Sequence, residues 1–196
     1  KDGVGVVWPI RYKDIAPWCS YVEKFAGISG NRDHLAILPD GEFMPPMQMN
    51  IVEKDVSNRL MDHYKNQRAM IIGRTANITE PLQARTNCQY RNKCWLGCPF
   101  GAYFSTQSST LPAATATGNL KVRPWSIVTR ILYDKDTKKA KGVEVLDAET
   151  MKTYEYYAKI IFLNASALNS AWVLMNSATD VWPDGLGSSS GELGHN

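Results

Sequence analysis

No apolar run in this 196-residue sequence is long enough to span a membrane: the best, residues 160–163, lies between Lys159 and Asn164, whereas a spanning helix needs roughly 18 apolar residues. A large excess of one charge is also lacking. The 22 Lys and Arg against 19 Asp and Glu leave a net charge of +3, too small a field to predict binding to nucleic acid. Repeats are absent, and a composition of 44% hydrophobic and 21% charged residues excludes a disordered or fibrous chain.

The sequence also lacks an initiator methionine, because it opens at Lys1, and it stops at Asn196 shortly after a turn rich in glycine and serine. These two ends lead us to expect a piece of a longer protein. A chain of this size is nevertheless large enough to bury a core of its own.

Helices are predicted where apolar residues recur at helical spacing, over residues 14–27, 51–64 and 111–117. In the first of them Asp14 is the expected N-cap and Gly27 lies near the C-cap. A loop rich in Gly, Pro, Asp and Asn separates the first two helices.

Strand-like runs follow at residues 120–133, 142–147 and 154–163, joined by polar segments compatible with turns. We expect them to form an antiparallel meander. The last run is uniformly apolar over residues 160–163, which is typical of a strand buried on both faces. It leads through Asn164-Ala165-Ser166 into a predicted helix that ends at Asn176. A buried strand followed by a small-residue turn and a helix is how α/β sheets approach a nucleotide.

Three of the four cysteines, Cys88, Cys94 and Cys98, lie within eleven residues and end in Cys98-Pro99. Zinc fits this spacing badly, because structural zinc sites favour two-residue knuckles and four ligands, and the nearest histidine is His63. A disulfide and an iron–sulfur cluster both remain open. Three thiolates suit a three-iron cluster better than a four-iron one.

A basic stretch surrounds the cysteines. Seven Lys or Arg residues against Asp62 and Glu80 give a local charge of +5 between Arg59 and Lys93, which would offset an anionic cluster. On charge alone, a solvent-exposed basic face is the simpler interpretation.

Several segments resemble the glucose–methanol–choline (GMC) oxidoreductases. The similarity rests on Trp8-Pro9-Ile10 with Tyr12 and Asp14, on Gly142-Val143-Glu144 in the meander, and on Ala165-Ser166-Ala167-Leu168-Asn169-Ser170. Ser166 and Ala171 depart from the family pattern, where Gly and Pro are usual. The three cysteines followed by Pro99 and Gly101-Ala102 resemble the catalytic subunits of bacterial FAD-dependent sugar and gluconate dehydrogenases, in which such cysteines hold a 3Fe-4S cluster.

This resemblance implies a partial GMC fold of class α+β, of the α/β FAD-binding type. Residues 1–110 would be the helix and loop region of a substrate or cap domain that carries the cysteines, and residues 111–196 would be part of the FAD-binding domain. The implied cofactor-binding residues are Val128, Asn164, Ala165, Ser166, Gly194 and Asn196, and the implied metal ligands are Cys88, Cys94 and Cys98.

The resemblance also implies an activity. The enzyme would oxidise the CH–OH group of a sugar, polyol or sugar acid with FAD, and electrons would pass through the 3Fe-4S cluster to a cytochrome c, with small subunits as further partners. The catalytic His and its His or Asn partner are expected beyond Asn196. The alternatives are a GMC-type oxidase relative without a cluster, or a binding module stabilised by disulfides or zinc.

Overall fold

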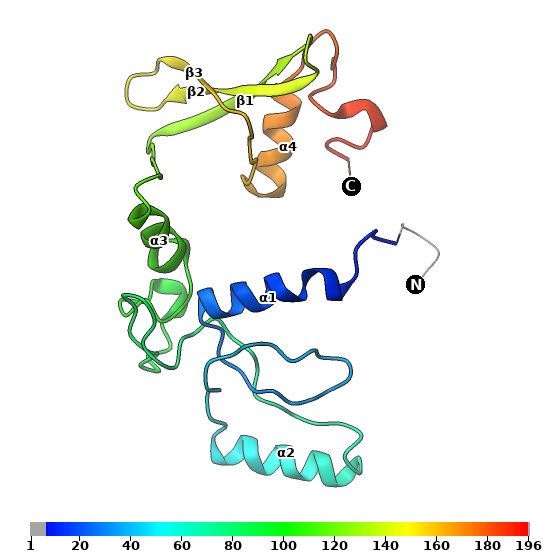
Figure 1. The fold of residues 1–196 in the computed structure, drawn as a ribbon, viewed down its shortest axis with the longest axis vertical. Coiled ribbons are helices and arrows are strands. Elements are labelled where there is room, and N and C mark those ends of the chain that lie inside the picture. The colour runs from blue at the N-terminus through cyan, green and yellow to red at the C-terminus, as the bar shows by residue number, and fades with distance from the viewer. Residues whose placement is uncertain (1–6, 196) are drawn as a thin grey trace. The chain divides into compact units, whose positions relative to one another are not determined.

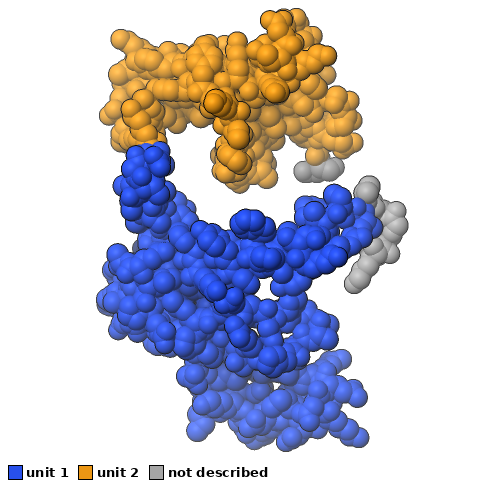
Figure 2. Space-filling model, viewed as in Figure 1, with its two compact units in different colours: residues 1–120 blue, residues 121–196 orange. Residues whose placement is uncertain are grey.

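The computed structural model describes residues 7–195 of the chain. It divides into two compact units, residues 1–120 and residues 121–196 (Figure 2). No helix in the described residues has both the length and the apolar character that a membrane span requires.

The first unit consists of helices joined by long loops (Figure 1). Its helices are α1 (Tyr12–Ala26), α2 (Ile51–His63) and α3 (Leu111–Ala116). All three confirm the predicted helices, with ends that differ by at most three residues. A π-helical turn, Thr106–Thr110, leads directly into α3.

Helix α1 ends as its sequence predicts but begins differently. Gly27 has a left-handed φ of 76°, and the N–H groups of Gly27 and Ile28 both donate to the Glu23 carbonyl, which is a common C-terminal helix motif. Asp14 is not the N-cap. The helix starts one turn earlier with Arg11 as its N-cap, and Asp14 Oδ2 accepts the Arg11 N–H at 2.8 Å. The carboxylate therefore reaches back to the cap from the third helical position.

The second unit is a three-stranded antiparallel sheet with one helix. Strands β1 (Ser126–Asp134), β2 (Lys139–Asp147) and β3 (Thr153–Tyr157) lie in the order β1-β2-β3, which confirms the predicted meander. Helix α4 (Ser166–Asn176) contacts β1. The buried apolar residues of this unit are Ile131, Val145 and Val173, so its small core lies between the sheet and α4.

The buried strand predicted over residues 160–163 is wrong for the described chain. Strand β3 ends at Tyr157, and the side chains of Ile160 and Phe162 are 71% and 80% exposed. A run that is apolar on both faces needs hydrogen-bonded strands beside it and a layer on each side. No described strand pairs with residues 160–163, which form no regular secondary structure.

Ser177 joins α4 to the free edge of β1. Its buried hydroxyl donates to the Val173 carbonyl at 2.6 Å and accepts the Ile131 N–H at 2.8 Å. Strand β1 lies at an edge of the sheet, so no further described strand offers an acceptor beyond it, and without Ser177 the buried Ile131 N–H would be unpaired. One hydroxyl therefore fixes α4 against the sheet.

Replacing Ser177 with alanine is expected to lower the free energy of unfolding by about 2 kcal/mol, because it leaves a buried N–H unpaired. Urea denaturation of the full-length protein measures the change. Ser189→Ala, at an exposed position of the same unit, is the matched control and should be neutral. Equal stability of the two variants would contradict this role of Ser177.

Candidate functional site

The cysteine loop, residues 88–98, is closed at its base by backbone hydrogen bonds. The Thr86 N–H donates to the Phe100 carbonyl (3.0 Å), and the Cys88 N–H donates to the Ile78 carbonyl (2.9 Å). The Ile78 N–H in turn donates to the Ala102 carbonyl (3.0 Å), and both Ile78 and Ala102 are fully buried. Backbone hydrogen bonds therefore connect both ends of the loop to the buried segments around Ile78 and Ala102.

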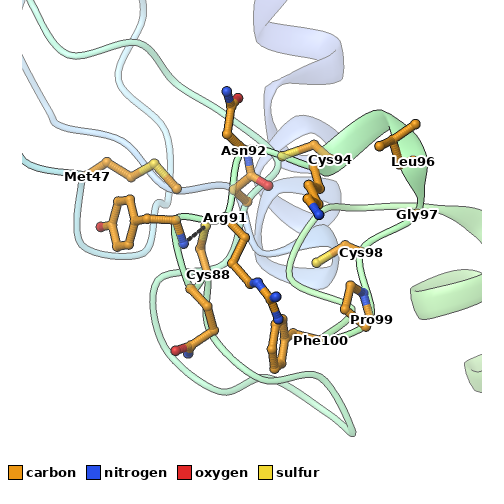
Figure 3. Close-up of a pocket in the computed structure, with 14 residues that line it drawn as sticks. Met47, Cys88, Arg91, Asn92, Cys94, Leu96, Gly97, Cys98, Pro99 and Phe100 are labelled. Atoms are coloured by element: carbon orange, nitrogen blue, oxygen red, sulfur yellow. Dashed lines mark hydrogen bonds between the residues drawn. The ribbon is translucent and has the colours of Figure 1, made fainter.

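All three cysteines of the loop line one cavity of about 510 Å³ (Figure 3). Each is a half-buried free thiol. Cys94 begins a short 3₁₀ turn, Cys94–Leu96, and the Cys88 sulfur accepts the Tyr90 N–H at 3.5 Å. The structure therefore brings the three predicted metal ligands to a single cavity.

Cys98 has the most distinctive environment of the three. The Gly101 N–H donates to the Cys98 carbonyl at 3.1 Å, so Pro99 and Gly101 occupy the second and fourth positions of a tight turn, as their residue types favour. Burial acts to raise the pKa of the Cys98 thiol. The backbone N–H groups that point at its sulfur, those of Tyr103, Phe100, Ala102 and Gly101, outweigh burial and hold this pKa below its ordinary value.

A second cavity, of about 660 Å³, is lined by part of the same loop. Cys94 and Cys98 line both cavities. Among the described residues, neither cavity is lined by an aspartate or glutamate, whereas Arg91 and Lys93 line the first and Arg85 lines the second. The surroundings of the sulfurs are basic and favour an anionic occupant.

The donor set has the right chemistry for a soft metal centre, since thiolates select iron–sulfur clusters, zinc or copper(I). Within residues 7–195, however, no three His, Cys, Asp or Glu side chains lie close enough together to hold a metal ion. The disulfide that the spacing left open is not formed either, because all four cysteines are free.

The basic stretch is mostly an exposed face, as predicted. Five of its seven residues are exposed: Arg59, Lys65, Arg68, Arg91 and Lys93. Arg74 is half-buried, with a nitrogen 3.6 Å from a carboxylate oxygen of Asp40. Arg85 is the exception, because only 4% of it is exposed. Sequence spacing gave no signal that distinguished Arg85 from its six neighbours.

In the second unit, three of the predicted cofactor-binding residues line one cavity of about 500 Å³. They are Val128 on β1, and Asn164 and Ala165 in the turn before α4. Asn169 and Trp172 of α4 line it as well, and both were missed at the sequence level. Their spacing from Ala165, four and seven residues, places all three on one helical face and could have indicated them.

The other predicted cofactor residues lie outside this cavity or outside the described chain. Ser166 is exposed and begins α4. Gly194 lies beside Met175 of α4, where an added Cβ would be 3.1 Å from the sulfur. Asn196 is outside the described residues.

Ser166 has a φ of 67°, in the left-handed region that favours glycine. Ser166→Gly is expected to raise the free energy of unfolding by about 1 kcal/mol, because a left-handed conformation strains any residue with a Cβ. Thermal or urea denaturation of the full-length protein checks this. Ser170→Gly, within the same helix, should instead destabilise by about 1 kcal/mol. A loss of stability in both variants would contradict the strain at Ser166.

The family model described as GMC oxidoreductase matches residues 9–196. A 2-methyl-1,2-propanediol dehydrogenase of Mycolicibacterium austroafricanum is 28% identical over 95% of this chain and 33% of its own length. A 6'''-hydroxyparomomycin C oxidase of Streptomyces lividus is 25% identical over 98% of this chain and 35% of its own length. The chain thus spans about a third of the length of these relatives.

Proposed function

The chain belongs to the GMC oxidoreductase family, and from that premise we propose that the full-length protein is an FAD-dependent enzyme that oxidises the CH–OH group of a sugar, polyol or sugar acid. The family match over residues 9–196 carries the enzyme class. Both relatives are named for compounds that carry hydroxyl groups, which supports a CH–OH donor. The second unit would belong to the FAD-binding domain, and the first to a substrate or cap domain.

The cavity of the second unit supports FAD as the cofactor. Val128 and Ala165 line the cavity and can contact a ligand through apolar side chains or backbone groups. Asn164 lines the same cavity, and its side-chain amide can both donate and accept a hydrogen bond. A cavity of about 500 Å³ with few polar groups suits part of a dinucleotide. We assign the adenosine side of FAD to these residues, with Ser166 at the start of α4 nearby.

The three cysteines are proposed to hold an iron–sulfur cluster of the 3Fe-4S type. The support is their place on one cavity, the basic residues around it and the backbone N–H groups directed at the Cys88 and Cys98 sulfurs. Such N–H groups are a usual means of stabilising thiolate ligands and of setting a cluster's potential.

When bound, FAD accepts a hydride from the carbinol carbon, and an iron–sulfur cluster carries electrons one at a time. The residues of this chain would bind and orient these groups. The tight turn at Pro99 fixes the Cys98 sulfur, and the exposed Arg91, which lies over the Phe100 ring, keeps positive charge at the cavity (Figure 3).

The proton of the substrate hydroxyl needs a base, which we propose lies outside this chain. Among the described residues, none of the side chains that line these three cavities is a histidine. His34 pairs with Asp40 at the surface, and His63 ends α2. A catalytic His with a His or Asn partner elsewhere in the protein, and a cytochrome c as electron acceptor with small subunits, complete the proposal.

The test is a cofactor analysis of the full-length protein purified without oxygen. We expect flavin absorbance that bleaches with a polyol or sugar substrate, iron and inorganic sulfide in a three-to-four ratio, and a low-temperature electron paramagnetic resonance signal. A protein without flavin would overturn the enzyme assignment.

A second candidate is an oxidase relative whose cysteines bind no metal. The observation that favours it is the spread of the three sulfurs, which form no metal-binding group within the described residues. In this case the protein would contain flavin but no iron, and would pass electrons from the flavin to oxygen.

A further inference from the structure

Strand β1 has one extra residue in its pairing with β2, at Thr129. Val128 pairs with Val145 before this position. Arg130 pairs with Glu144 after it, so Thr129 has no partner of its own in this ladder. Such an insertion is a β-bulge, a feature that bends a strand and is over-represented next to active sites. Here the residue before the bulge, Val128, lines the cavity that we assign to the adenosine side of FAD.

The bulge decides on which face of the sheet Val128 lies. Successive residues of a strand point to opposite faces, so Val128 and Ile131, three positions apart, would normally lie on opposite faces. Their partners on β2 are Val145 and Val143, which are two positions apart and share a face. The extra residue therefore puts Val128 on the same face as Ile131. This is the face of the buried core, against which α4 packs (Figure 1).

One carboxylate binds both residues of the bulge. Thr129 Oγ1 donates to Glu144 Oε1 at 2.8 Å, and Arg130 Nη2 donates to Glu144 Oε2 at 2.7 Å. The Glu144 side chain is only 20% exposed, and the hydrogen bonds from Arg130 and Thr129 hold the pKa of its carboxyl below its ordinary value. Hydrogen bonds to a charged acceptor are stronger than those between neutral groups. The two bonds therefore stabilise the bulged path of β1.

We propose that Thr129 and Glu144 are positioning residues for the cofactor: their hydrogen bond fixes the bulge that keeps Val128 at the adenosine cavity. This inference rests on the proposed FAD site. Both residues lie in the described part of the chain and outside the lining of that cavity. Their effect on a bound cofactor passes through the backbone of β1.

The test compares dissociation constants for FAD in the full-length protein after removal of its flavin. Thr129→Val removes the hydroxyl at nearly constant volume, and Glu144→Leu removes its acceptor. Each is expected to weaken FAD binding about tenfold, the effect of losing a hydrogen bond to a charged group. Thr129→Ser keeps the donor and should bind FAD like the wild type. Asp180→Asn, which removes the ion pair with Lys135 in the same unit, is the matched control and should also leave FAD binding unchanged.

Urea denaturation of the same flavin-free variants separates positioning from folding. Residues needed only for folding would lower the free energy of unfolding and leave the folded fraction with wild-type affinity for FAD. The double variant should bind FAD no more weakly than Glu144→Leu alone, because that substitution already removes the acceptor of Thr129. If Glu144→Leu does not fold, Glu144→Gln replaces it, because it removes the charge and keeps the shape.

Wild-type affinity for FAD in folded Thr129→Val, or an equal loss in Thr129→Ser, overturns the inference and leaves the proposed function in place. A wild-type protein that binds no FAD overturns the proposed function, and this inference with it.

Discussion

If the cysteines hold the proposed cluster, replacing Cys98 with serine is expected to remove the iron from the full-length protein while the flavin stays bound. Serine is a hard oxygen donor, and the four backbone N–H groups that stabilise a sulfur at this position would face a neutral hydroxyl instead. Reduction of the flavin by substrate should continue. Transfer to a one-electron acceptor should fall at least about tenfold, in line with the loss in affinity or activity that follows disturbance of a metal site. Iron analysis, flavin absorbance and stopped-flow kinetics measure these three quantities.

The matched control for this experiment is Cys19→Ser. Cys19 is a half-buried free thiol on α1 and lines neither cavity of the cysteine loop. It should retain both iron and acceptor activity. Iron at wild-type levels in the Cys98 variant would show that this sulfur is not a ligand.

Gly142→Ala is expected to destabilise the second unit by about 3 kcal/mol, near the upper end of the range for overpacking. Gly142 is buried in the central strand β2, opposite Tyr157 of β3. A Cβ here would overlap the Tyr156 carbonyl oxygen and lie 3.1 Å from the Tyr157 ring. The overlapping atom belongs to the backbone, so relief requires β2 and β3 to separate.

Thermal unfolding of the full-length protein, with the second unit followed by hydrogen exchange, measures this loss. Gly73→Ala is the control, since an added Cβ there meets no atom within 4 Å. Flavin content should fall along with stability in the Gly142 variant, because β1 and α4 carry the proposed adenosine cavity. A loss of less than about 1 kcal/mol in the free energy of unfolding would contradict the close approach of the added Cβ to the β3 backbone, because substitutions at uncrowded surface positions usually cost less than that.

The sequence predicted those elements whose signals are local. Gly27 ends α1 and the polar segments between the strands form turns because the conformations involved depend on a few adjacent residues. The predicted start of α1 was wrong because an aspartate near the start of a helix has two common places. It can be the N-cap itself, or it can stand at the third helical position and accept the N–H of the N-cap, as Asp14 does for Arg11. Residues 160–163 carry a pattern that depends on neighbouring strands, so their own composition could not establish their pairing.

For the candidate sites too, the sequence predicted features that depend on adjacent residues and missed those that depend on distant ones. Cysteine spacing indicated a common site, and the structure places the three side chains on one cavity, although not within metal-binding distance of each other. Arg85 could not be found from spacing, because its burial depends on α1 and on the turn at Gly101, which are distant in sequence. Trp172 was missed because an aromatic residue on a helix more often signals packing than a cavity wall.

The hydrogen-bonded base of the cysteine loop bears on what a change at a cysteine would disturb. The bonds that Thr86, Cys88 and Ile78 make there join backbone groups only, and no sulfur takes part in them. A substitution that alters a thiol is therefore expected to change the ligands offered by the loop and to leave its anchoring to the rest of the unit intact.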